Sequence, residues 1–387
     1  MDFARRIAHL RAEGAYAVLA RAQALEAQGR EIIHLEIGQP DFATYPHVAL
    51  AGIKAIATGQ TRYNPPAGLP ALREALAEDA GRRRGMEFRA EQVVVAPGTK
   101  PLLLLPMMAV LEPGDEVLYP DPGFPSYEAA IGLAGGVPVP VPLLEEQGYD
   151  LDLEALERSL SPRTRLILLN SPGNPTGGIH SRQTLARVAE LARRRDAWVL
   201  SDEIYARLVY EGDAPSIVQM PGMADRTIIA DGFSKTYAMT GWRLGFAVMP
   251  EPLAEKMNLL LTHIVGCTAT FTQMAGLEAV RGPQDAVDAV VAEFRRRRDA
   301  IVAGLNAIPG VRCPTPRGAF YAFPNVRSFG CSSSELADYL LDQAGVAVLP
   351  GSAFGLNGEG YLRLTYANST ENIKKALERM AAALAAL

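Results

Sequence analysis

Short apolar segments alternate with helical stretches between residues 90 and 230, and this alternation restricts the fold of the chain more than any other feature. The apolar segments are rich in valine, isoleucine and leucine, which predicts strands at 92–96, 115–119, 166–169, 198–201 and 226–230. Strands that are joined through helices lie mostly parallel in one sheet. We therefore expect an α/β fold with a large, mostly parallel sheet that helices cover.

A serine, a lysine and an arginine follow the last of these strands. Ser234 and Lys235 come just after the strand at 226–230, and Arg243 lies eight positions beyond Lys235, between two glycines. In open α/β sheets this carboxyl edge is where ligands bind. An amine can hold an aldehyde as a Schiff base, while a hydroxyl and a guanidinium can bind a phosphate. The three side chains together predict pyridoxal phosphate (PLP), a phosphorylated aldehyde, as the ligand.

Other strand ends carry groups that suit the same ligand. Gly98 and Thr99 follow the strand at 92–96 and precede a helix, whose free N–H groups can bind an anion. Phe124 is either a ring that stacks on a flat ligand or a core residue. Asp202 is either a functional carboxylate or a helix N-cap. The turn at 97–100 lacks the full pattern G-x-x-x-x-G-K-[ST], so nucleotide binding has little support.

Composition and residue spacing exclude several other classes of protein. The chain has 387 residues and a formal net charge of −5 without a dominant basic stripe, which argues against nucleic-acid binding. Its three cysteines are widely spaced and fit a reducing cytoplasm, and its five histidines form no metal-binding pair, so we expect no metal. The N-terminal residues do not resemble a signal peptide. The run 257–277 lacks charged side chains but contains polar ones, so we expect a buried or subunit-interface helix and loop and no membrane association.

The two ends of the chain predict a second, smaller domain. A helix from residue 1 to about 30 precedes a strand at 32–37. The C-terminal part has an α+β pattern, with helices expected at 284–308, 332–344 and 370–387 and strands at 318–323, 346–351 and 361–365. We expect a large domain at 45–285 and a small domain built from 1–44 and 286–387.

Several short motifs occur in a specific order along nearly the whole chain. They are Gly38-x-Pro40-Asp41, Tyr63-x-x-x-x-Gly68, Asn174-Pro175-x-Gly177, Asp202-x-x-Tyr205, Ser234-Lys235, Gly241-x-Arg243-x-Gly245 and Arg363. In this order and spacing the chain resembles the class I/II aminotransferases of PLP fold type I, which are similar to aspartate aminotransferase. The resemblance implies PLP as the cofactor, a seven-stranded type of sheet in the large domain, and a homodimer with shared active sites.

The resemblance also implies how the cofactor ring is held. Lys235 looks like the lysine that joins PLP as a Schiff base and then moves the proton. Asp202 is similar to the carboxylate that pairs with the pyridine nitrogen. Tyr205 and Asn174 match the groups that hydrogen-bond the 3-oxygen of the ring. Phe124 takes the place of the stacking aromatic side chain, which is tryptophan or tyrosine in many relatives.

The family's phosphate site has matching residues as well. Ser234, Arg243 and the backbone at Gly98 and Thr99 correspond to the groups that surround the phosphate. Tyr63 resembles the tyrosine that reaches the phosphate of the neighbouring subunit, and it is the residue on which the homodimer expectation depends.

The substrate-binding end is less defined. Arg363 matches the arginine that binds the substrate α-carboxylate, with Gly38 and Asn174 nearby. Lys100 stands where relatives that act on aspartate often carry a lysine for a second carboxylate, which favours aspartate or glutamate as one partner. However, the segment 258–275 has no arginine, whereas the best-known aspartate enzymes bind the substrate side chain with one from this region. The identity of the amino acid and of the oxo acid therefore stays open.

The reaction that the resemblance implies is transamination between an L-amino acid and a 2-oxo acid in a ping-pong cycle. A PLP-dependent β-eliminase or a biosynthetic cyclase on the same fold is the alternative, and a non-catalytic regulatory protein is a more distant one. A serine hydrolase is excluded, because the residues around Ser234 read G-F-S-K-T and not G-x-S-x-G.

Overall fold

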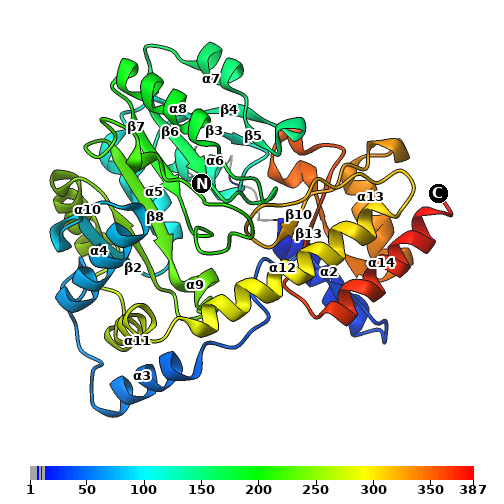
Figure 1. The fold of residues 1–387 in the computed structure, drawn as a ribbon, viewed down its shortest axis with the longest axis horizontal. Coiled ribbons are helices and arrows are strands. Elements are labelled where there is room, and N and C mark those ends of the chain that lie inside the picture. The colour runs from blue at the N-terminus through cyan, green and yellow to red at the C-terminus, as the bar shows by residue number, and fades with distance from the viewer. Residues whose placement is uncertain (1–6, 8–9, 11–13) are drawn as a thin grey trace, which may run out of the picture.

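The computed structural model describes residues 7, 10 and 14–387, and its central feature is an eight-stranded sheet (Figure 1). The strands lie in the order β2-β9-β8-β7-β6-β3-β4-β5. Their bounds are β2 Val93–Ala96, β3 Glu116–Asp121, β4 Val137–Leu144, β5 Asp150–Leu151, β6 Thr164–Asn170, β7 Trp198–Asp202, β8 Thr227–Gly232 and β9 Gly245–Val248. The expected α/β fold is confirmed, and the short β5 adds one strand to the expected seven-stranded type of sheet.

The direction of the strands brings the predicted site residues to one edge of the sheet. Strands β4, β3, β6, β7 and β8 are neighbours in parallel pairs. Strand β9 lies between β8 and β2 and is antiparallel to both. Its start therefore lies at the same edge as the carboxyl ends of the parallel strands. Arg243, just before β9, comes to the edge that also carries Asp202 and Lys235.

Alternate residues of the strands pack against helices on opposite faces of the sheet. In β2, Val93 and Val95 join a core that includes side chains of α4 and α11, whereas Val94 and Ala96 join a core that includes side chains of α5 and α10. Both faces are thus covered, which explains the nearly continuous apolar sequence of these strands. The helices are α3 Pro46–Ala57, α4 Pro70–Arg84, α5 Lys100–Val110, α6 Ser126–Leu133, α7 Leu153–Ser159, α8 Arg182–Arg195, α9 Phe233–Thr236, α10 Glu251–Ile264 and α11 Thr270–Arg281.

Residues near both ends of the chain form two smaller sheets beside the large one (Figure 1). Strand β1 (Ile33–His34) pairs in parallel with β11 (Val346–Ala347). Strand β13 (Leu362–Thr365) lies between β10 (Tyr321–Ala322) and β12 (Leu349–Pro350) and is antiparallel to both. The helices of this part are α2 Gly14–Glu26, α12 Asp285–Asn306, α13 Ser333–Tyr339 and α14 Thr370–Leu384.

The structure corrects the length of several predicted elements. The strands expected at 32–37 and 318–323 shorten to β1 and β10, because each finds only two partner residues in the neighbouring strand. The helix expected at 332–344 changes at Leu340 into a π-helical turn, Leu340–Ala344. Of the helix expected from residue 1 to about 30, the structure describes α2, and residues 1–6, 8–9 and 11–13 lie outside the described residues. Short 3₁₀ turns occupy Ala90–Gln92, Glu145–Gln147, Ile217–Gln219, Arg327–Phe329, Gly351–Phe354 and Leu356–Gly358.

The uncharged run 257–277 forms two helices with a loop between them. Helix α10 ends at Ile264 and α11 begins at Thr270, so the run is interrupted, as its threonines and glutamine suggested. Among the residues that the structure describes, none of the helices combines the length and the apolar character that crossing a membrane requires.

Candidate active site

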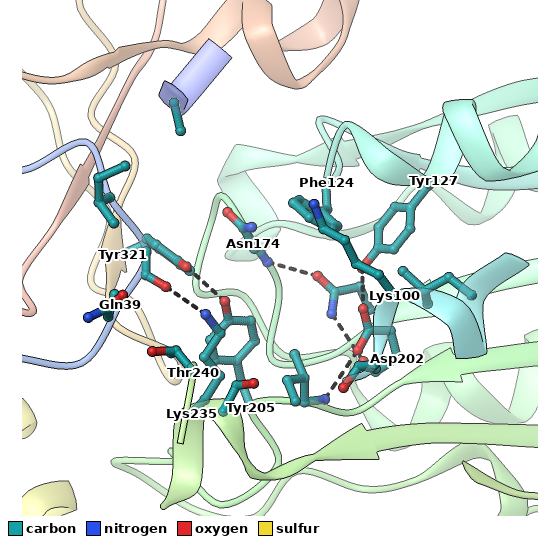
Figure 2. A pocket seen from close by; sticks show the side chains of 18 of the residues that line it. Gln39, Lys100, Phe124, Tyr127, Asn174, Asp202, Tyr205, Lys235, Thr240 and Tyr321 are labelled. Carbon is teal, nitrogen blue, oxygen red and sulfur yellow. Dashed lines mark hydrogen bonds between the residues drawn. The ribbon is translucent and has the colours of Figure 1, made fainter. Parts of the chain in front are cut away.

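A pocket of about 580 Å³ lies at the carboxyl edge of the large sheet and also receives residues of α2, β10 and β13 (Figure 2). Most of the predicted site residues line it: Gly38, Thr99, Lys100, Phe124, Asn174, Asp202, Tyr205, Ser234, Lys235, Arg243 and Arg363. Gly98 lies behind this lining in contact with Arg243, whereas Tyr63 is not among the lining residues.

The carboxylate of Asp202 is held at the end of β7, where only 4% of the residue is exposed. The Tyr127 hydroxyl donates to its Oδ2 at 2.8 Å, and the backbone N–H of Ile204 donates to its Oδ1 at 3.2 Å. Burial raises the pKa of Asp202 to about 6, and these hydrogen bonds oppose that rise. The group is therefore still mostly ionised at neutral pH, and Asp202 acts as a buried anion rather than as a helix cap.

Lys235 reaches the pocket from α9, the short helix that directly follows β8. Its Nζ donates to the carbonyl oxygen of Gly38 at 2.6 Å and lies 5.8 Å from the centre of the Phe320 ring. Figure 2 shows Lys235, Tyr205 and Tyr321 on one side of the pocket, with Phe124 and Asp202 on the other. The amine of Lys235 and the ring of Phe124, which is the candidate for stacking on a flat ligand, thus line the same pocket.

The turn after β2 packs tightly against the segment before β9. Gly98 has a φ of +88°, and a Cβ there would lie 2.2 Å from Nη2 of Arg243. A Cβ on Gly245 would lie 2.5 Å from the carbonyl carbon of Gly98, so both glycines are needed for the approach. Arg243 itself has a φ of +56° and donates from Nη1 to the carbonyl oxygen of Thr240 at 2.8 Å.

The groups in this pocket fit PLP. The hydroxyls of Thr99 and Ser234 and the guanidinium of Arg243 line the pocket near the N-terminus of α5, which suits a phosphate. The buried anion Asp202 suits a protonated ring nitrogen, and the amine of Lys235 suits an aldehyde.

A buried guanidinium lies at the side of the pocket that β13 forms. Arg363 donates from Nη1 to Oδ1 of Asn174 at 3.3 Å and from Nη2 to the carbonyl oxygen of Glu36. Its Cζ lies 4.6 Å from the centre of the Tyr321 ring and 5.1 Å from that of Phe354. This arrangement fixes the plane of the guanidinium, which a bidentate contact with a carboxylate requires.

Three tyrosines that line the pocket were not predicted from the sequence: the exposed Tyr16 and the buried Tyr127 and Tyr321. Tyr127 binds Asp202, as described above, and Tyr321 shares a hydrogen bond of 2.7 Å with the hydroxyl of Tyr205. The position of Tyr127 after the Phe124 loop was a usable signal, because a helix that begins at a sheet edge points its first turn toward the same space. Tyr321 was placed in a strand of the small domain, and no local pattern linked that strand to Tyr205.

Two predicted residues have a different environment. Tyr63 is 97% exposed, so in a single chain it reaches no group of the pocket described here. Lys100 begins α5, is exposed, and lines the pocket with its Nζ 5.3 Å from the centre of the Phe124 ring.

Comparisons with known proteins agree with this site. The family model "Aminotransferase class I and II" matches residues 30–380. A probable aspartate/prephenate aminotransferase from Aquifex aeolicus is 40% identical, over 98% of each chain. An aromatic-amino-acid aminotransferase 2 from Thermococcus litoralis is 41% identical, over 92% of each chain. A solved aspartate aminotransferase from Thermus thermophilus, with maleate, superposes with a TM-score of 0.94 at 39% identity, covering 99% of this chain and 100% of that one.

These relatives are named as aminotransferases, and none of the three names favours elimination, cyclisation or regulation. With the family model over nearly the whole chain and with a pocket whose groups fit PLP, the chain belongs to the class I and II aminotransferases and is a PLP-dependent enzyme.

Proposed function

We propose that the chain moves an amino group between an L-amino acid and a 2-oxo acid in a ping-pong cycle, with the sequence-predicted residues in the roles given above. The observation that carries this proposal is the gathering of an amine, a buried carboxylate and a buried guanidinium around one pocket, in Lys235, Asp202 and Arg363. PLP, when bound, supplies an electron sink for negative charge at the substrate Cα.

Each side chain then has a separate task. Asp202 keeps a proton on the ring nitrogen by charge pairing, and Tyr127 holds that carboxylate in place. Arg363 binds the substrate α-carboxylate and so orients the Cα–H bond. Lys235 would hold the aldehyde of the cofactor and, as a free amine, would act as the general base for the proton at the substrate Cα. Tyr205 and Asn174 bind the 3-oxygen, and Phe124 covers the ring.

Replacing the lysine tests the proposal. Lys235→Ala should lose the absorbance of the lysine-bound cofactor, together with a factor of about 10²–10⁴ or more in turnover. Lys256→Ala, in α10 and away from the pocket, is the matched control and should retain both. Substantial turnover by Lys235→Ala would refute the assigned role.

We further propose aspartate or glutamate as one substrate. Lys100 supports this, since its ammonium lines the pocket and can meet a second carboxylate. The similar Thermus thermophilus structure contains maleate, which is a dicarboxylate, and the Aquifex aeolicus relative is named for aspartate.

The proposal includes a homodimer with shared active sites. Tyr63 extends from the chain with 97% of its surface exposed, as expected of a side chain that reaches the phosphate site of a second subunit. Leu50, Ile53 and Ile56 form an exposed apolar stripe on α3, at the spacing of one helical face. Tyr63→Phe should weaken cofactor retention while the dimer persists in sedimentation. A monomer that retains PLP and is active would contradict the shared site.

The proposal also covers the division of the chain into domains and its location in the cell. A large domain at 45–285 and a small domain from 1–44 and 286–387 are supported by the separate sheets, because β1 and β10–β13 lie in the terminal parts. A cytoplasmic location is supported by Cys267, Cys313 and Cys331, which are all free thiols.

A further inference from the structure

We propose that Tyr321 is a positioning residue that joins Tyr205, on the cofactor side of the pocket, to Arg363, on the substrate side. The inference rests on the proposed function, in which Tyr205 binds the 3-oxygen of the ring and Arg363 binds the substrate carboxylate. Tyr321 would aim the Tyr205 hydroxyl into the pocket and support the guanidinium plane of Arg363 at the same time.

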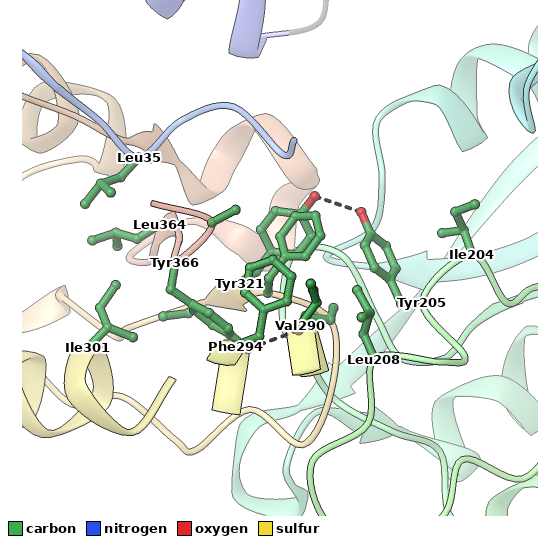
Figure 3. Close-up of a cluster of buried hydrophobic side chains, with 14 of the residues drawn as sticks. Leu35, Ile204, Tyr205, Leu208, Val290, Phe294, Ile301, Tyr321, Leu364 and Tyr366 are labelled. Atoms are coloured by element: carbon green, nitrogen blue, oxygen red, sulfur yellow. Dashed lines mark hydrogen bonds between the residues drawn. The ribbon is translucent and has the colours of Figure 1, made fainter. Parts of the chain in front are cut away.

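The contact between the two tyrosines connects the large sheet to the three-stranded sheet of β10, β13 and β12. Tyr205 follows β7, whereas Tyr321 begins β10, and their hydroxyl oxygens lie 2.7 Å apart (Figure 3). Tyr205 and Tyr321 are 3% and 1% exposed, so water does not compete for the bond. Their rings meet edge to face at 82° with centres 5.7 Å apart. A buried hydrogen bond with this ring packing holds both hydroxyls in a fixed direction.

The same ring supports the substrate-binding arginine. Tyr321 pairs with Thr365 across the β10–β13 ladder, so Arg363, two positions earlier, is its diagonal neighbour on the same face. Its guanidinium carbon lies 4.6 Å from the ring centre. A cation against the ring makes the Tyr321 hydroxyl the better donor of the pair. Tyr205 would then accept from Tyr321 and keep its own O–H for an acceptor in the pocket.

The glycine beside Tyr321 shows how closely this arrangement is packed. A Cβ on Gly38 would lie 2.1 Å from the Tyr321 hydroxyl oxygen, so any larger residue would displace that hydroxyl. The carbonyl oxygen of Gly38 accepts from Nζ of Lys235. Tyr321 therefore lies against the segment that contacts the catalytic lysine as well as against Tyr205 and Arg363.

The charged and titratable groups that face Tyr205 come from several elements. They are Asp202 at the end of β7, Tyr127 on α6, Lys235 on α9, Arg363 on β13 and Tyr321 itself. Burial raises the pKa of Tyr205 well above its usual value, so the hydroxyl stays protonated and can act as a donor. In a pH titration of the bound cofactor, the midpoint of the unmodified enzyme must therefore be compared with the midpoints of variants in which one of these groups is replaced.

The test uses the full-length holoenzyme and the variants Tyr321→Phe, Tyr321→Leu and Tyr205→Phe. Loss of a donor to the 3-oxygen makes that oxygen more basic, so Tyr205→Phe should move the midpoint of the pH titration of the cofactor absorbance upward. Tyr321→Phe should move it in the same direction by less, and lower kcat by about fivefold, because one hydrogen bond is lost while the ring remains. KM for the amino acid should change by less than about twofold in Tyr321→Phe and rise by about fivefold or more in Tyr321→Leu, which removes the ring from Arg363.

Two controls separate positioning from general stability. Tyr366→Phe removes the hydroxyl of another fully buried tyrosine in the adjoining core, one that donates to Ala319, and should leave the titration midpoint unchanged. In the double variant Tyr205→Phe/Tyr321→Phe the midpoint should match that of Tyr205→Phe alone, because Tyr321 acts through Tyr205.

An unchanged midpoint in Tyr321→Phe, or additive shifts in the double variant, would overturn the inference. So would a Tyr321→Phe effect that only lowers the thermal unfolding midpoint. These outcomes leave the proposed function intact, which fails separately if Lys235→Ala retains the lysine-bound absorbance.

Discussion

Replacing Lys100 with methionine tests how the site recognises the side chain of the substrate. Lys100 is the first residue of α5 and lines the pocket with its ammonium 5.3 Å from the centre of the Phe124 ring. Methionine keeps the length of the side chain and loses the charge. If Lys100 binds a second carboxylate, Lys100→Met should impair only amino acids that carry one.

The size of the effect follows from the exposure of the lysine. Two unit charges 4 Å apart attract by about 1 kcal/mol in bulk water and by about 4 kcal/mol at the effective dielectric of a protein surface. Because Lys100 is exposed, solvent screens the pair, and we expect a loss in the lower half of this range, about 1–2 kcal/mol. This corresponds to a decrease of about 5- to 30-fold in kcat/KM.

The assay mixes the enzyme with one amino acid at a time and follows the loss of the lysine-bound cofactor absorbance. Aspartate and glutamate should react about 5- to 30-fold more slowly with Lys100→Met, and alanine and phenylalanine should be unaffected. Lys374→Met, at an exposed position on α14, is the control for the loss of one charge. An equal loss with alanine would show that Lys100 serves the cofactor or the Phe124 packing, and no loss with aspartate would remove it from the substrate site.

Three further predictions follow from the geometry. Gly98→Ala places a methyl group 2.2 Å from a guanidinium nitrogen at a φ of +88°, so cofactor retention, measured by dialysis, should weaken by about tenfold or more. Tyr127→Phe removes a hydrogen bond that opposes the burial-driven rise in the pKa of Asp202 to about 6; the acid limb of the activity profile should therefore move to higher pH. His34 gains a hydrogen bond to the buried Glu36, which raises its pKa from 6.5 to about 9. Since the folded value lies above the unfolded one, this stability is complete below pH 6.5 and is lost as the pH rises through 9. His34→Gln should cost about 1–2 kcal/mol at pH 6 and nearly nothing at pH 10, measured by denaturant unfolding.

The sequence predicted those parts of the site that local patterns determine. Asp202 and Lys235 each follow an apolar strand, and a residue after a parallel strand has to lie at the carboxyl edge of the sheet. Arg243 was associated with them by spacing alone, and the structure explains why: β9 is antiparallel, so the residues before it return to the same edge. The α/β fold, the parallel strands that carry these residues and the location of the pocket were therefore predictable.

What the sequence could not predict depends on contacts between distant segments. Strand β4 was not predicted, because its alternating valines and prolines do not resemble a strand. The prolines are tolerated because β5 pairs with β4 only at Leu143 and Leu144, which leaves the rest of the outer side of β4 unpaired. The pairing of Tyr205 with Tyr321 spans more than a hundred residues and depends on how the segment after β7 meets the segment before β10, where Val209 and Gly318 form a bridge. Such a contact leaves no periodic or motif-like trace in either segment.

Residues from two different sheets form the pocket, so substitutions can affect substrate binding and cofactor binding to different extents. Thr99, Asp202 and Lys235, which we propose to contact the phosphate, the ring and the aldehyde, lie at the edge of the large sheet. Arg363, which we propose to bind the substrate carboxylate, lies on β13 in the three-stranded sheet. On the roles proposed above, changes around β13 should alter substrate binding more than cofactor binding, and the hydrogen bond between Tyr205 and Tyr321 is one of the contacts that join the two parts of the pocket.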